Sequence, residues 1–70
     1  MDIVPMTLKA ARINKGFTQK QAALLIGCAE DTIGNWERGL SFPDIPQLKK
    51  LEKAYEVPYS ELIFLVSNSD

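Results

Sequence analysis

The sequence contains no histidine and a single cysteine, Cys28. Without histidine, neither a histidine-based catalytic triad nor the common zinc sites can be assembled, and one cysteine cannot form a disulfide within the chain. The sequence also has no apolar run near the roughly 18 residues that a membrane span needs, and it lacks the opening segments of a signal peptide. We therefore predict a cytoplasmic protein that is not an enzyme and uses no cofactor, metal, membrane or small-molecule substrate.

Neither size nor overall charge is distinctive. The 70 residues, 46% of them apolar, are typical of one small globular domain, which we expect to span residues 1–70 with an ordered core from about 6 to 66. Eight basic and nine acidic side chains give a net charge of -1, so the chain as a whole does not attract nucleic acid. Any binding to DNA must come from a local surface.

Glycine and proline divide the sequence into pieces of helical length. The apolar spacing predicts five helices, over residues 6–15, 19–26, 30–38, 46–55 and 59–64. Thr18 and Gln21 have the spacing of a capping box at the start of the second helix, and Gly27 follows its end. Since no segment shows the sustained alternation of a strand, we predict a compact all-α fold.

The second and third predicted helices are separated only by Gly27, Cys28 and Ala29, and two short helices joined by such a turn form a helix-turn-helix, here over residues 19–38. Ala23 is small where the second helix must approach the third, and Gly27 stands where the turn needs a positive φ. Ile33 and Trp36, three residues apart, are expected to fill the angle between the two helices.

The chain resembles the helix-turn-helix family of phage repressors, Cro proteins and xenobiotic-response-element (XRE) regulators. The resemblance extends from Leu8 through Leu62, and its matching segments are residues 17–19, 21–23, 33–39, 43, 48–57 and 61–62. It implies a five-helix, lambda-repressor-like domain that binds a two-fold symmetric DNA operator as a homodimer. It also implies that the third helix lies in the major groove.

The resemblance places base-reading positions on Glu30, Asp31 and Asn35. An asparagine can pair with N6 and N7 of adenine, and a carboxylate can accept a hydrogen bond from N4 of cytosine. The two acids have a second interpretation, because carboxylates in the first turn of a helix stabilise it through the helix dipole, and Ala29 is a poor N-cap. Both interpretations remain open.

Other residues are predicted to contact the DNA backbone, to hold the helices in place or to form a dimer. In the family, the glutamine that matches Gln19 holds a DNA phosphate at the start of the second helix. Arg12 and Glu37 match a partly buried ion pair that serves as scaffold. The residues that we predict to contact the DNA backbone are Thr18, Gln19, Lys20, Arg38 and Ser41. The apolar segment Ile63, Phe64, Leu65 and Val66 is expected either to pack on the first helix or to form a dimer or partner contact.

Two features leave alternatives open. Leu24 and Leu25 make the second helix apolar nearly all round, so that either more of it is buried than usual, which we favour, or it exposes an apolar patch. Gly34, inside the third helix, indicates a close approach either to DNA or to the second helix. The leading hypothesis is a repressor or Cro-like regulator of phage or prokaryotic type. The alternative is a helix-turn-helix scaffold that binds a protein partner and has little affinity for DNA.

Overall fold

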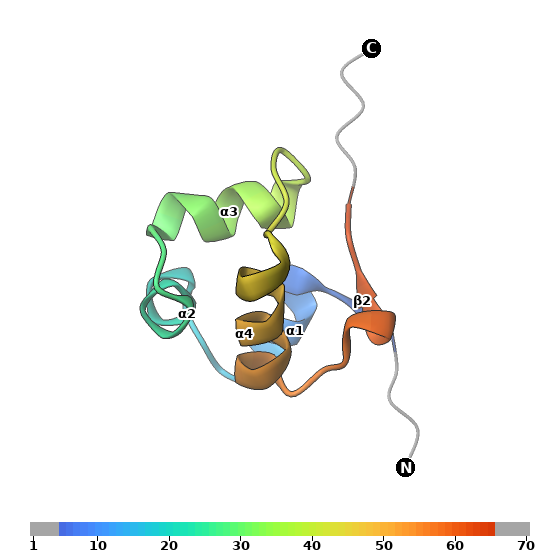
Figure 1. The fold of residues 1–70 in the computed structure, drawn as a ribbon. Coiled ribbons are helices and arrows are strands. Elements are labelled where there is room, and N and C mark those ends of the chain that lie inside the picture. Colours follow the sequence, from blue (N-terminus) through green and yellow to red (C-terminus); the bar gives the residue numbers. More distant parts are fainter. Residues whose placement is uncertain (1–4, 66–70) are drawn as a thin grey trace.

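The computed structural model describes residues 5–65, which form four α-helices, one 3-10 turn and two very short strands (Figure 1). In chain order the elements are β1 (Met6–Thr7), α1 (Leu8–Asn14), α2 (Gln19–Ile26), α3 (Glu30–Arg38), α4 (Ile45–Tyr55), the 3-10 turn (Tyr59–Glu61) and β2 (Leu62–Ile63). The helical class is confirmed, whereas the count of five helices is wrong. Within the described residues, the structure has no helix long and apolar enough to cross a bilayer.

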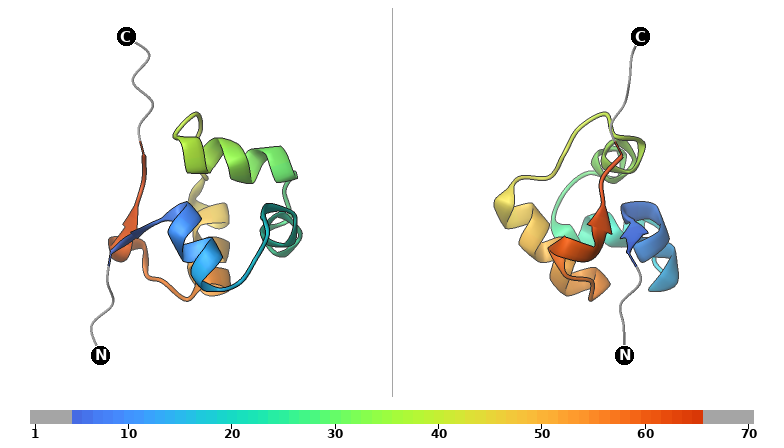
Figure 2. Two further views of the ribbon diagram at one scale, coloured as in Figure 1. Left: turned by 180° about the vertical axis from the view of Figure 1, so that it is seen from behind. Right: turned by 90° about the vertical axis from the view of Figure 1, so that its right-hand side faces the viewer.

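The predicted fifth helix, 59–64, is replaced by the 3-10 turn and by β2. Leu62 has φ -89° and ψ 130°, which are extended values, and β2 pairs in parallel with β1 so that Met6 lies opposite Leu62. Figure 2 shows the two strands side by side next to α1. A six-residue helix is too short to be stable by itself, so pairing with the residues ahead of α1 prevails. The same pairing delays the start of α1 from the predicted Met6 to Leu8.

The ends of α2 follow the expected capping chemistry. The hydroxyl of Thr18 accepts a hydrogen bond from the backbone N–H of Gln21 (3.1 Å), and the Gln21 side chain accepts one from the N–H of Thr18 (2.8 Å). Gly27 ends the helix with φ 86°, a conformation that glycine adopts without the strain a β-carbon would bring. Ala29 then begins α3 without a side-chain cap, as predicted. Residues 19–38 therefore form two helices joined by a three-residue turn.

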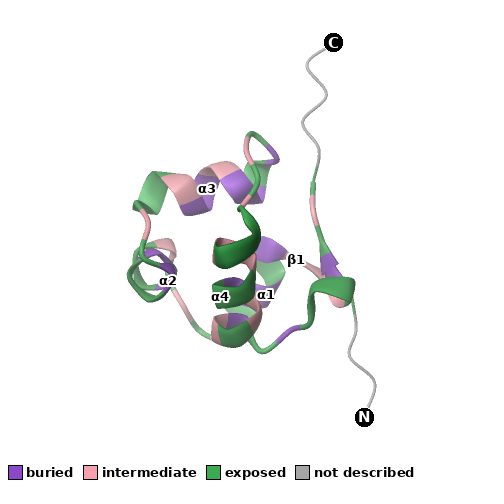
Figure 3. Cartoon of the chain, viewed as in Figure 1, coloured by how far each residue is buried: buried purple, intermediate pink, exposed green. Residues whose placement is uncertain are grey.

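The core lies where α2 packs against both α3 and α4 (Figures 1 and 3). Ile33 and Trp36 are 1% and 3% exposed, which confirms that they fill the space between the helices. Ala23 is also buried, so its small side chain lies in the closely packed interior, as predicted. The buried apolar residues of this core are Leu8, Ala11, Ala22, Ala23, Ile26, Ile33, Trp36, Leu51, Tyr55, Val57 and Leu62.

One prediction about α2 is wrong. Leu24 and Leu25 are 76% and 55% exposed, although we favoured their burial. Ala22, Ala23 and Ile26 already face the neighbouring helices, and no further element of the described chain covers the outer side of α2. The second alternative, an exposed apolar patch, is the one that the structure shows.

Candidate nucleic-acid interface

The third helix is held along one side and open along the other. Ile33, Trp36 and Glu37 are buried against the rest of the molecule, whereas Glu30 and Asp31 in the first turn are exposed. Figure 3 shows this division between the inner side of α3 and its first turn. A helix fixed in this way is a rigid rod whose outer side chains are available to a ligand.

A buried ion pair fixes the orientation of α3. Arg12 of α1 donates two hydrogen bonds to Glu37, from Nε to Oε2 (2.6 Å) and from Nη2 to Oε1 (3.3 Å), and both residues are only 8% exposed. A third donor of Arg12, Nη1, binds the carbonyl oxygen of Phe17 just ahead of α2 (2.8 Å). The hydrogen bond with Glu37 raises the pKa of Arg12, so the guanidinium stays charged. The pair that we expected as scaffold thus connects α1, α3 and the entry to α2.

Gln19, the first residue of α2, belongs to the same network. Its side-chain Nε2 donates to Oε1 of Glu37 at 3.1 Å. One of its two amide hydrogens is therefore used inside the protein, and the carbonyl oxygen and the other hydrogen remain. Glu37 consequently sets the position of the amide that we predicted to lie on a DNA phosphate.

The space above Gly34 brings three polar side chains together. A β-carbon at Gly34 would lie 3.3 Å from Nη1 of Arg38 and 3.5 Å from Nε2 of Gln19. Nη2 of Arg38 in turn donates to Oδ1 of Asn35 at 2.8 Å. We call Gln19, Asn35 and Arg38 the polar cluster. Of the two explanations left open for Gly34, the structure shows the close approach to α2.

The N-terminus of α2 offers further donors beside the polar cluster. The capping box uses the N–H groups of Thr18 and Gln21, but the first amides of a helix, here those of Gln19 and Lys20, have no partner within it. Such amides, together with the positive end of the helix dipole, suit an anion such as phosphate. Lys20 is exposed and adds a positive charge at the same end, and Ser41 lies half-buried in the loop after α3.

Comparison with known proteins agrees with this geometry. A family model described as helix-turn-helix matches residues 8–62. The chain belongs to the helix-turn-helix family. It is also similar to the HTH-type transcriptional regulator ImmR of Bacillus subtilis (strain 168), with 38% identity over 56 residues. That match covers 80% of this chain and 44% of ImmR, so the chain spans less than half the length of that relative. The predicted resemblance to XRE-type helix-turn-helix proteins is thereby confirmed.

The first turn of α3 is acidic, which sets its electrostatics apart from those of the last turn. Glu30 and Asp31 occupy the first turn of α3, and Arg38 occupies its last turn. Both placements are favourable for the helix dipole, and the first offsets the missing side-chain cap at Ala29. Acidic side chains also repel phosphates, so this end of α3 suits base edges with exposed donors better than the DNA backbone.

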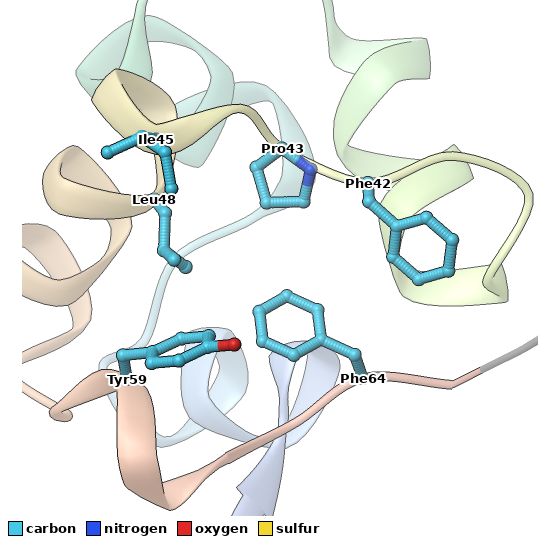
Figure 4. Close-up of a pocket in the computed structure, with 6 residues that line it drawn as sticks. All are labelled: Phe42, Pro43, Ile45, Leu48, Tyr59 and Phe64. Carbon is cyan, nitrogen blue, oxygen red and sulfur yellow. The ribbon is translucent and has the colours of Figure 1, made fainter.

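An apolar groove lies at another part of the molecule, next to the C-terminal segment of the described chain. It measures about 200 Å³ and is lined by Phe42, Pro43, Ile45, Leu48, Tyr59 and Phe64 (Figure 4). The Phe64 ring is centred 6.5 Å from that of Phe42 and 6.0 Å from that of Tyr59. Ile63 and Leu65 beside it are 45% and 46% exposed, whereas Val66 lies outside the described residues.

Sequence reasoning named the members of the polar cluster but missed how they are connected. Nothing in the sequence indicated that Gln19 binds Glu37, or that Arg38 binds Asn35, since both contacts depend on the crossing of α2 and α3. The aromatic groove was also missed, because Phe42 precedes α4 whereas Tyr59 and Phe64 follow it, so their proximity depends on the fold. The available signal was the gathering of aromatic and proline residues in two separate segments, around Phe42 and Pro43 and around Tyr59 and Phe64.

Cys28 and the acidic residues add no chemistry to this surface. Burial raises the pKa of the Cys28 thiol, which makes the reactive thiolate less available. Among residues 5–65, no three acidic or cysteine side chains gather as they would around a metal ion.

Proposed function

We propose that this chain is a sequence-specific DNA-binding transcriptional regulator, of repressor or Cro-like type, which lays α3 in the major groove. The observation that carries the proposal is the polar cluster, in which Gln19 of α2 and Arg38 of α3 both lie close to Gly34, and Arg38 donates to Asn35. Phosphate contacts position a protein on DNA, and base contacts give sequence preference. The cluster places a candidate of each kind within one small region of a rigid helix pair.

In this proposal the backbone contacts come from the start of α2. The free amides of Gln19 and Lys20, the Lys20 ammonium group and the Thr18 hydroxyl all belong to this end of the helix. The hydroxyl accepts from the N–H of Gln21 and keeps its own hydrogen to donate. Arg38 and Ser41 complete the predicted contacts with the DNA backbone.

Asn35 is the principal candidate for reading a base. Because Arg38 donates to Oδ1, the amide is held in one orientation, with the Nδ2 donors and one remaining lone pair of Oδ1 free. An amide with a free donor and a free acceptor matches N7 and N6 of adenine. Glu30 and Asp31 are the second candidates, and a cytosine N4 group is the donor that they would accept.

We further propose that the regulator acts as a homodimer on a two-fold symmetric operator. Ile63 and Leu65 are exposed beside the aromatic groove, and the half-buried Phe64 lines it, which suits a second copy of the chain. A dimer of this kind presents two copies of α3 to half-sites about 34 Å apart. Sedimentation of the wild-type protein and of Phe64→Ser tests this contact, and a monomeric wild-type protein on operator DNA would refute it.

The DNA-binding proposal is tested by fluorescence anisotropy with DNA from upstream of the protein's own gene and with scrambled DNA, each at two salt concentrations. We expect a specific complex with a shallow salt slope, since two or three ionic contacts each contribute about 0.9 to it. Asn35→Ala should relax the preference by about 1–3 kcal/mol at one base pair, whereas Gln19→Ala should weaken binding to all sequences alike. Equal affinity for both DNAs at low salt would refute the proposal.

Glu30→Gln separates the two interpretations of the acidic turn. If Glu30 only repels phosphates, the variant binds every sequence more tightly. If Glu30 reads a cytosine, the variant loses affinity for DNA that carries that base pair and keeps its affinity for DNA in which the pair is changed. Lys20→Gln is a control for the general effect of charge. Lys20 lies at the end of α2 that we propose to bind the DNA backbone, so its loss should weaken binding to every sequence.

A further inference from the structure

The outer side of α2 carries an apolar surface that DNA binding does not explain. Leu24 and Leu25 are 76% and 55% exposed, and two grooves of about 290 and 380 Å³ adjoin them. Leu25 lines both grooves, so the two are parts of one continuous surface. We call this the α2–α4 surface, and its residues are Phe17, Gln21, Leu24, Leu25, Lys50, Lys53 and Ala54.

The rim of this surface is positively charged. Lys50 and Lys53 of α4 line the groove beside Leu25, and the ion pairs found among residues 5–65, Arg12–Glu37 and Lys15–Glu56, involve neither of them. Glu52, their nearest acidic neighbour along α4, accepts a hydrogen bond from the N–H of Tyr59 instead. The two lysines therefore have no carboxylate partner within the described chain.

Lys50 also gives this part of the surface a defined shape. Its ammonium group lies 3.4 Å from the carbonyl oxygen of Ile26, at the C-terminus of α2. A cation at this end of a helix is favourable, and the contact links α4 to α2 across the groove. The cationic rim is therefore held next to the leucines.

We infer that the α2–α4 surface binds an acidic amphipathic helix of a partner protein. Apolar side chains of that helix enter the grooves beside Leu24 and Leu25, and its carboxylates meet Lys50 and Lys53. Helix-in-groove recognition needs this combination of apolar pockets and complementary charge. The groove beside Leu25 lies between residues of α2 and of α4, which suits inserted side chains better than the flat face of an anionic bilayer.

The partner and DNA do not compete for the same residues. No residue of α3 lines either groove, and the C-terminal turns of α4, which carry Lys53 and Ala54, form the end of that helix farther from α3 (Figure 1). The inference thus adds a protein contact to the proposed DNA-bound regulator, and it does not depend on DNA binding.

The test uses two labelled synthetic helices of about 18 residues, with leucines at i, i+3, i+4 and i+7 and either glutamate or lysine elsewhere. We expect the full chain to bind the glutamate peptide at least about tenfold more tightly than the lysine peptide, with an affinity that falls as salt is added. Leu25→Gln should weaken binding about tenfold and Lys53→Gln about threefold. Leu40→Gln is the matched control, since Leu40 is 60% exposed and lies outside the surface.

Four results would overturn the inference. The first is equal affinity for the two peptides, and the second is an effect of Leu25→Gln no larger than that of Leu40→Gln. The third is binding to phosphatidylglycerol vesicles, lost in Leu25→Gln, without binding to the glutamate peptide, which would assign the surface to a membrane. The fourth is a dimer that Leu25→Gln converts to a monomer, which would assign it to a second copy. We expect Leu25→Gln to keep the wild-type affinity for operator DNA, so a failure of this inference can be told apart from a failure of the DNA-binding proposal.

Discussion

Replacement of Glu37 by leucine is the strongest test of how the helix-turn-helix is held together. In the structure, Arg12 is 8% exposed and directs two of its nitrogens to Glu37. Glu37→Leu leaves that guanidinium buried without its counter-charge. It also releases the side chain of Gln19 from its hydrogen bond.

The expected loss is large relative to the stability of so small a protein. Removing one partner of a buried ion pair typically destabilises by about 3–5 kcal/mol. A chain of this length has a total unfolding free energy of roughly 4–10 kcal/mol. We therefore expect Glu37→Leu to be partly or wholly unfolded at room temperature. Arg12→Met combined with Glu37→Leu should recover most of the loss, because apolar residues of similar volume replace both charges.

The recovery should not be complete. Arg12 also donates to the carbonyl oxygen of Phe17, and leaving this partly buried acceptor without its donor costs about 1 kcal/mol. The double variant is thus expected to lie about 1–2 kcal/mol below the wild type. Because Gln19 no longer has Glu37 as its partner, the folded double variant should also bind operator DNA more weakly.

The assay is urea unfolding, followed by far-ultraviolet circular dichroism and by the fluorescence of Trp36, which is the only tryptophan and is buried. Arg12→Met completes the double-mutant cycle. A loss below about 1 kcal/mol for Glu37→Leu would refute our account of the ion pair. So would a double variant that is as unstable as Glu37→Leu alone, since removing the second charge would then have relieved nothing.

Three further predictions concern single residues of the core and of the turn. Gly34→Ala should stabilise the protein by about 0.5–1 kcal/mol in urea unfolding, because alanine favours the helix and only the flexible ends of the Gln19 and Arg38 side chains must shift. A loss of stability would show that these side chains cannot move. Gly27→Ala should destabilise by about 1 kcal/mol in the same assay, because φ is 86° there, and an unchanged midpoint would contradict this. Burial raises the pKa of Tyr55 to about 12, so between pH 10 and 12 the folded protein keeps the phenol proton that the unfolded chain loses. The unfolding free energy should therefore be constant up to about pH 10 and fall by about 2–3 kcal/mol between pH 10 and 12. In Tyr59→Phe, which leaves Tyr55 as the only tyrosine, the absorbance of tyrosinate should rise only as the pH approaches 12 while the protein stays folded, and ionisation near pH 10 in the folded protein would refute the effect of burial.

The bounds of α2 could be predicted because its ends carry their own chemistry. Thr18 and Gln21 form the expected capping box, and Gly27 has the expected positive φ, because both are local properties of the chain. The segment at 59–64 has no such capping pair, and its conformation depends on pairing with Met6 and Thr7, which lie more than fifty residues earlier. A contact of that separation leaves no periodic pattern in the sequence.

The candidate site divides in the same way. Residue types suggested what Asn35 and Gln19 can bind, but not which of their hydrogen-bonding groups are already in use. The exposure of Leu24 and Leu25 was misjudged because apolar residues on every side of a helix usually indicate burial on every side. Burial requires a neighbouring element, and the described chain provides none on the outer side of α2.

Gly34 shows how the stability of α3 and the proposed binding of DNA oppose each other. Glycine inside a helix is about 1 kcal/mol less favourable than alanine, yet its missing β-carbon leaves the space that the ends of the Gln19 and Arg38 side chains border. A methyl group at this position stabilises the helix and pushes apart the side chains that we propose to contact DNA. If the polar cluster binds DNA, Gly34→Ala must therefore raise the unfolding free energy and lower the affinity for operator DNA. A role in helix packing alone would not produce these opposite changes.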